Sequence, residues 1–193
     1  MKHLFYLITT ALLFLASCDS NIHPTTPKVP QREGIQWGEF IFGEINAWDA
    51  VEEFRLPYLT ADGLADTLSC VLPYSMPKSD INSIFEDDIN FDSIPDVQII
   101  LGNQNWWGNT IYEGFVWDKE KGCFTYVDNY RDIFSPEIHS DSLYILGTDY
   151  FSFEGHYTVT YTKYQWIDGV LTETDSWSDH GSTWGDEEED EEE

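Results

Sequence analysis

Short apolar runs separated by turn residues dominate the middle of the chain. β-Branched and aromatic residues enrich these runs, which predict strands at 35–45, 64–72, 97–101, 112–117, 123–127 and 170–177. Loops at 118–122 and 168–169 contain glycine and are typical of hairpins. Residues 46–55 fit a short helix or a strand equally well, and 130–134 fit one helical turn. The pattern predicts a mainly β fold, an antiparallel meander or partial propeller-like sheet with at most two short helices.

The last predicted hairpin carries many aromatic residues. Apolar side chains alternate on one face from Tyr157 to Tyr161, whereas Tyr164 and Trp166 fall on the opposite parity. One extra residue in a strand reverses this parity. A β-bulge near Thr162 would therefore bring all these rings to the same side of the sheet.

The two ends of the chain differ in composition from its strand-forming middle. Lys2 precedes an apolar run that ends at Leu15, which is too short to span a bilayer and predicts a secretory signal. Cys18 then follows Leu-Ala-Ser, which matches the bacterial lipobox, so lipidation is expected at Cys18. We expect a signal peptide at 1–17, the lipidated cysteine and a flexible tether at 18–34, a β domain at 35–177 and a disordered acidic tail at 178–193.

The charge of the chain restricts the classes of molecule that it can bind. It has 9 Lys and Arg against 36 Asp and Glu, a formal net charge of −27. Nucleic acid is excluded, because its binding needs cationic side chains that neutralise phosphates. Membrane contact is expected only through the lipid anchor. A basic protein is the partner that this charge attracts.

An acidic loop is the strongest chemical signal. The candidate ligands are Asp88, Asn90, Asp92, Asp96 and the carbonyl of Ile94, at positions 1, 3, 5, 9 and 7 of the loop. Hard oxygen ligands in this order are typical of Ca²⁺. Ser93 stands at the usual glycine position and Ile99 where an EF-hand has glutamate. The alternative is a loop whose Asp and Asn side chains only cap turns.

The loop and the strand after it, Asp88–Leu101, resemble integrin-like FG-GAP/VCBS repeats. Downstream, Phe115–Phe124, Ser135–Glu137 and Tyr161–Leu171 are similar to single-loop exported lipoproteins of bacteria. That group includes immunity proteins that inhibit secreted peptidoglycan hydrolases. The resemblance implies a propeller-like β fold, a metal-stabilised loop and inhibition of a cell-wall hydrolase.

Two further sets of residues have open interpretations. Trp106, Trp107 and Asn105 would suit a glycan site, or the tryptophans would pack on the sheet. Cys70 and Cys123 can form a disulfide after export, or remain as two buried thiols.

The sequence has no clear nucleophile–base pair and no phosphate loop, so an enzyme is not expected. We expect an envelope lipoprotein, at the outer membrane or surface, that acts as a binding module and inhibits a basic hydrolase. A glycan-binding lipoprotein and a structural envelope protein are the alternatives.

Overall fold

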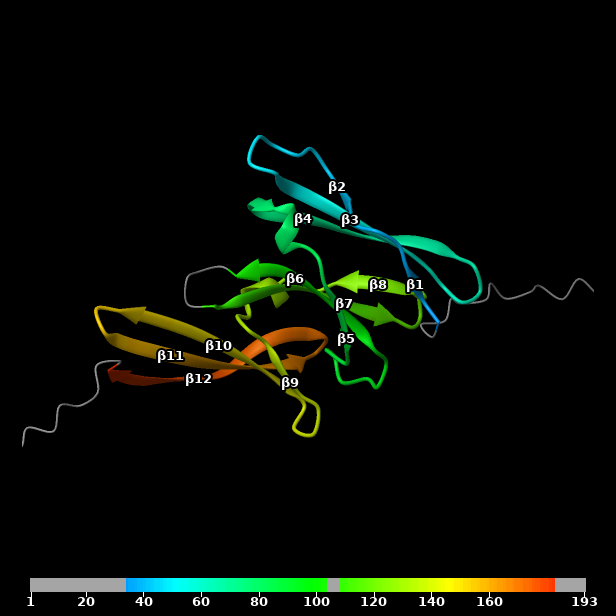
Figure 1. The fold of residues 1–193 in the computed structure, drawn as a ribbon. Coiled ribbons are helices and arrows are strands. Elements are labelled where there is room, and N and C mark those ends of the chain that lie inside the picture. The colour runs from blue at the N-terminus through cyan, green and yellow to red at the C-terminus, as the bar shows by residue number, and fades with distance from the viewer. Residues whose placement is uncertain (1–33, 104–107, 183–193) are drawn as a thin grey trace, which may run out of the picture.

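The computed structural model describes residues 34–103 and 108–182, which form three antiparallel four-stranded sheets (Figure 1). The first sheet contains β1 (Gln36–Trp37), β2 (Ile41–Phe42), β3 (Ala50–Leu59) and β4 (Ala65–Pro77). The second contains β5 (Ile84–Asp87), β6 (Asp96–Asn103), β7 (Thr110–Asp118) and β8 (Cys123–Tyr126). The third contains β9 (Glu137–His139), β10 (Tyr144–Phe153), β11 (His156–Ile167) and β12 (Val170–Ser182). The helical elements in these residues are two short 3₁₀ turns, η1 (Lys78–Asp80) and η2 (Tyr130–Asp132).

The prediction of a mainly β, antiparallel fold is confirmed. Strands of the second and third sheets follow one another in chain order, as in a meander. The hairpin loops predicted at 118–122 and 168–169 join β7 to β8 and β11 to β12. The helical turn predicted at 130–134 is η2.

The second sheet lies between the other two, with a hydrophobic cluster on each side (Figure 1). Side chains alternate between the faces of a strand, so β7 contributes to both clusters. Phe115 and Trp117 pack into the cluster against the first sheet, whereas Tyr112 and Val116 pack into the cluster against the third. The second sheet is therefore covered on both faces.

Several predicted boundaries are wrong. The run at 35–45 is broken into the two short strands β1 and β2, which pair with different parts of β3. Residues 46–55 do not form a helix: Asn46 caps a turn by accepting from the N–H groups of Trp48 and Ala50, and β3 follows.

Other strands are longer than predicted or were not predicted at all. β4 continues beyond residue 72 to Pro77, and β12 continues beyond residue 177 to Ser182 through its pairing with β11. The sequence pattern did not predict β5, β9 or β10. The signal peptide, Cys18, the tether up to residue 33 and the tail from residue 183 lie outside the described residues. Among the residues that are described, no helix is long and apolar enough to cross a membrane.

Candidate functional site

In the acidic loop between β5 and β6, backbone N–H groups donate to the loop's own Asp and Asn side chains. Both carboxylate oxygens of Asp88 accept N–H groups, from Asp92 at 2.9 Å and from Ser93 at 2.8 Å. The side-chain oxygen of Asn90 also accepts from the Asp92 N–H, at 3.1 Å. Oδ2 of Asp92 lies 3.3 Å from the Lys119 ammonium. These are the turn-capping contacts of the alternative interpretation.

Asp96 ties this loop to the second sheet. Its Oδ2 accepts from the N–H groups of Ile89 at 3.0 Å and Asn90 at 3.2 Å, and its Oδ1 accepts from Trp117 N–H at 2.7 Å. The side chain is fully buried. Burial raises the pKa of Asp96 to about 7, although the Trp117 and Asn90 N–H groups oppose the rise. Asp96 therefore anchors the base of the loop to β7.

The remaining contacts of the loop involve Asp92 and Ile94. Oδ1 of Asp92 accepts from the Ile94 N–H at 2.9 Å, and the Ile94 side chain packs against the first core cluster. Within 34–103 and 108–182, no three His, Cys, Asp or Glu side chains are placed to hold a metal ion. The calcium site stays a prediction from the sequence.

Ser93 adopts the left-handed backbone conformation that its loop position requires, with φ of 67°. The left-handed conformation costs about 1–2 kcal/mol for a residue with a Cβ, and glycine adopts it without this cost. Ser93→Gly is therefore expected to raise the free energy of unfolding by about 1 kcal/mol in urea titrations, equally in EDTA and in Ca²⁺. Ser142→Gly, in a turn without a positive φ, is the control and should lower stability slightly.

Calcium binding by the loop would change the thermal stability of the protein. If Ca²⁺ alone raised the unfolding midpoint, and Asp88→Ala/Asp92→Ala abolished that rise, the loop would be a calcium site. A net charge of −27 attracts cations without a specific site, so Mg²⁺ at the same concentration is the necessary comparison.

The predicted β-bulge exists, but it lies in the other strand. Where β11 and β12 lose register, Tyr164 pairs with Glu173 and Thr174 is the extra residue. The sequence placed the bulge in β11, near Thr162. β11 instead pairs with β10 residue for residue from His156 to Tyr164. The bulge reverses the parity of β12 and leaves that of β11 intact.

Aromatic rings therefore occupy both faces of the third sheet, which corrects the predicted single face. Tyr164 and Trp166 pack inward against the second core cluster, and the Trp166 Nε1–H donates to the Ile89 carbonyl at 2.8 Å. Tyr157 and Tyr161 lie on the opposite face. We call that face, which carries Tyr144, Tyr150, Tyr157, Tyr161 and Trp177, the outer face.

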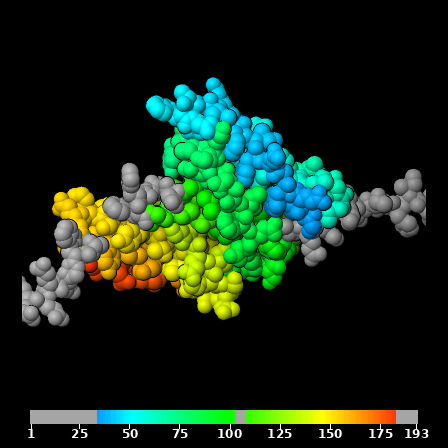
Figure 2. All heavy atoms as spheres, in the orientation of Figure 1, coloured from blue at the N-terminus to red at the C-terminus, as the bar shows by residue number. Residues whose placement is uncertain are grey.

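Three near-parallel ring stacks cover the outer face. They join Tyr161 to Trp177, Tyr150 to Tyr157 and His139 to Tyr144, with centroids 5.4, 6.0 and 4.5 Å apart. Trp177 remains 45% exposed. None of the residues of the outer face belongs to either core cluster. The far ends of β10, β11 and β12 project beyond the other two sheets (Figures 1 and 2).

Charge on the outer face is mixed but mostly acidic. Asp175 and Asp179 flank Trp177 on β12, which is the edge strand of the sheet. Lys163 lies over the Tyr144 ring, with its ammonium 4.5 Å from the ring centroid. The part of this face nearest the edge therefore combines an exposed indole with two carboxylates.

A buried ion pair joins the first two sheets. Glu113 of β7 is fully buried and accepts from the guanidinium of Arg131, which belongs to η2. The same guanidinium donates to the Val71 carbonyl of β4 at 3.0 Å and lies 3.5 Å from the Cys70 sulfur. Burial raises the pKa of Glu113, and Arg131 opposes that rise.

Cys70 and Cys123 are free thiols, so the disulfide alternative is not realised. Cys70 faces Arg131 and Glu113, whereas Cys123 begins β8 opposite Asp118. Burial raises the pKa of both thiols, which keeps them protonated and unreactive at neutral pH.

Trp106, Trp107 and Asn105, the predicted glycan ligands, lie outside the described residues. Sequence reasoning did not identify Glu113 and Arg131 as partners, or Trp177 as part of an exposed face. A glutamate inside the apolar run 110–118 was an available sign of a buried charge.

Comparisons with known proteins give no family. No family model and no curated protein matches the chain, so nothing beyond the motifs themselves supports the FG-GAP or immunity-protein resemblance. A structure described as that of a Xanthomonas type IV secretion system related protein is weakly similar. It has 11% identity and a TM-score of 0.33, over 74% of this chain and 90% of that one.

Proposed function

We propose that this chain is a non-catalytic binding module that recognises a basic protein through the outer face of its third sheet. The observation that carries the proposal is the uncovered row of aromatic stacks beside Asp175 and Asp179. Exposed contiguous apolar surface of this kind marks interaction sites. Trp and Tyr are also the residue types that dominate the energy of protein interfaces.

Charge favours a cationic partner for this face. Arginine side chains stack on Tyr and Trp rings and form ion pairs with carboxylates at the same time. The net charge of −27 attracts such a partner over a longer range and speeds its encounter. Both effects select against acidic proteins and nucleic acids.

The cell envelope supplies partners of this chemistry. Peptidoglycan and its attached polymers are anionic, so enzymes that degrade them gain from a basic surface. We propose that the chain is a lipid-anchored envelope protein whose partner is such a hydrolase. The lipobox ending at Cys18 supports the location, and the acidic, aromatic outer face supports the partner.

Biolayer interferometry with purified basic muramidases, amidases and endopeptidases tests the proposal. Trp177→Ala is expected to weaken binding by about 30-fold, because it removes the exposed ring at the centre of the acidic edge. Trp48→Ala is the matched control, since Trp48 is 86% exposed on the loop before β3. Asp175→Asn/Asp179→Asn should slow association and reduce its dependence on salt. The acidic tail is the same in every variant.

Three results would contradict the proposal. One is the absence of binding to any basic hydrolase at low salt. Another is equal loss of binding in Trp177→Ala and Trp48→Ala. The third is retention of the full-length chain by insoluble peptidoglycan without any hydrolase contact, which would favour the glycan alternative.

A further inference from the structure

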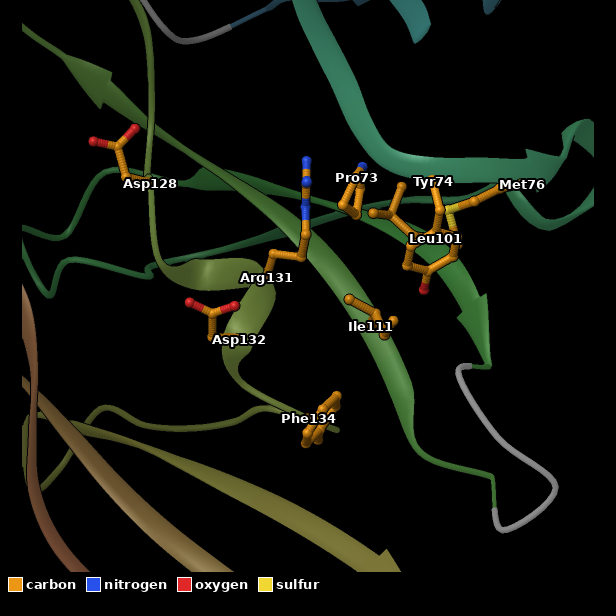
Figure 3. A pocket seen from close by; sticks show the side chains of 9 residues that line it. All are labelled: Pro73, Tyr74, Met76, Leu101, Ile111, Asp128, Arg131, Asp132 and Phe134. Carbon is orange, nitrogen blue, oxygen red and sulfur yellow. The ribbon is translucent and has the colours of Figure 1, made fainter. Parts of the chain in front are cut away.

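A cavity opens between the first and second sheets, away from the outer face. Its volume is about 550 Å³, within the range of small-molecule sites. Its walls come from β4, β6, β7 and the segment around η2 (Figure 3). The lining residues are Pro73, Tyr74, Met76, Leu101, Ile111, Asp128, Arg131, Asp132 and Phe134.

The cavity has an apolar side and an acidic side. In Figure 3, Met76, Leu101 and Ile111 lie on one side of Arg131, and Asp128 and Asp132 lie on the other. A ligand that fills the cavity therefore meets apolar surface at one end, including the exposed Tyr74, and carboxylates at the other.

Arg131 does not neutralise these aspartates. Its guanidinium pairs with the buried Glu113 and donates to the Val71 carbonyl, so its charge is already balanced. Among the described residues, neither Asp128 nor Asp132 forms an ion pair. The cavity thus carries two uncompensated negative charges beside its apolar wall.

We propose that this cavity binds a small organic cation with an apolar body. The body would pack over the exposed Tyr74, which lines the cavity together with the buried Met76, Leu101 and Ile111, and the ammonium or guanidinium head would lie beside Asp128 and Asp132. None of the lining residues belongs to the outer face. A failure of the cavity proposal would therefore leave the proposed protein interface unaffected, and the reverse also holds.

The test uses three probes of one shape: 2-phenylethylammonium, neutral 2-phenylethanol and anionic phenylacetate. Methyl NMR of the full-length chain follows Met76, Leu101 and Ile111, which separates the cavity from diffuse cation binding by acidic segments. We expect 2-phenylethylammonium to shift these methyl signals at millimolar concentration. The neutral probe should bind about tenfold more weakly, and the anion should not bind.

Asp128→Asn/Asp132→Asn is expected to weaken binding of the cation about tenfold and to leave the neutral probe unchanged. Asp141→Asn/Asp168→Asn, in two exposed turns, makes the same change in net charge and should have no effect. Equal binding of the cationic and neutral probes would overturn the proposal. So would equal effects of the two double variants, or unshifted methyl signals with all three probes.

Discussion

Replacement of Arg131 by methionine is expected to lower the free energy of unfolding by about 3–5 kcal/mol at pH 7. The substitution leaves the Glu113 carboxylate fully buried without its cation. It also removes the hydrogen bond to the Val71 carbonyl, which joins η2 to the first sheet. Urea unfolding monitored by tryptophan fluorescence measures the loss.

The same variant should become sensitive to pH. Without Arg131, the pKa of Glu113 rises further, because burial is then opposed by fewer groups. A folded-state pKa above the unfolded value means that the folded protein binds the proton more tightly. The contribution of protonated Glu113 to the stability of the variant is then fully present below about pH 4, and it is lost as the pH rises through the folded-state pKa of Glu113.

A second substitution checks this explanation. Arg131→Met/Glu113→Leu removes both charges and should recover at least half of the loss, because an apolar pair carries no desolvation penalty. The exposed pair Lys78–Asp49 is the control, and Asp49→Asn should change stability by less than about 1 kcal/mol. If the double variant were as unstable as Arg131→Met, the unpaired carboxylate would not be the cause.

Gly114→Ala is expected to destabilise the protein by about 3 kcal/mol. A Cβ at Gly114 would lie 2.5 Å from Cγ of Tyr130, at the base of the ring. Tyr130 is fully buried, and its hydroxyl donates to the Gln98 side chain at 2.8 Å. The ring therefore cannot move aside without disturbing its packing and this hydrogen bond. Thermal and urea unfolding measure the effect.

The reason for this loss can be isolated. In a Tyr130→Ala background, itself destabilised, Gly114→Ala should cost less than about 0.5 kcal/mol, because the clashing ring is absent. At Gly63 an added methyl meets no atom within 4 Å, so Gly63→Ala pays only for its positive φ, about 1 kcal/mol. Additive effects of Gly114→Ala and Tyr130→Ala would show that the two positions do not clash.

Local rules explain where sequence reasoning succeeded. The hairpin loops at 118–122 and 168–169 are short and contain Gly122 and Gly169 at positive φ, so neighbouring residues alone specify them. The same holds for Ser93, whose left-handed conformation follows from its position in the acidic loop. Local sequence did not predict β10, because its polar and glycine residues are held by pairing with β11 on one side and β9 on the other.

The candidate sites depended on long-range pairing. Arg131 and Glu113 are brought together by the packing of η2 on β7, which no local pattern contains. The location of the bulge is a similar case. An extra residue in either strand of the hairpin changes the relative parity of the two strands, and only their pairing with β10 and the core shows which strand carries it.

The sequence by itself determined a mainly β chain, its two tight hairpins and its acidic charge, because alternation, turn residues and composition act locally or as sums. The tertiary structure decided which face of each sheet is covered. Alternation places Tyr161 and Trp166 on opposite faces of β11, but it does not say which face the second sheet buries. Trp166 packs against the Ile89 backbone, so the face of β11 that carries Trp166 is the buried one. Tyr161 and Trp177 therefore lie on the outer face.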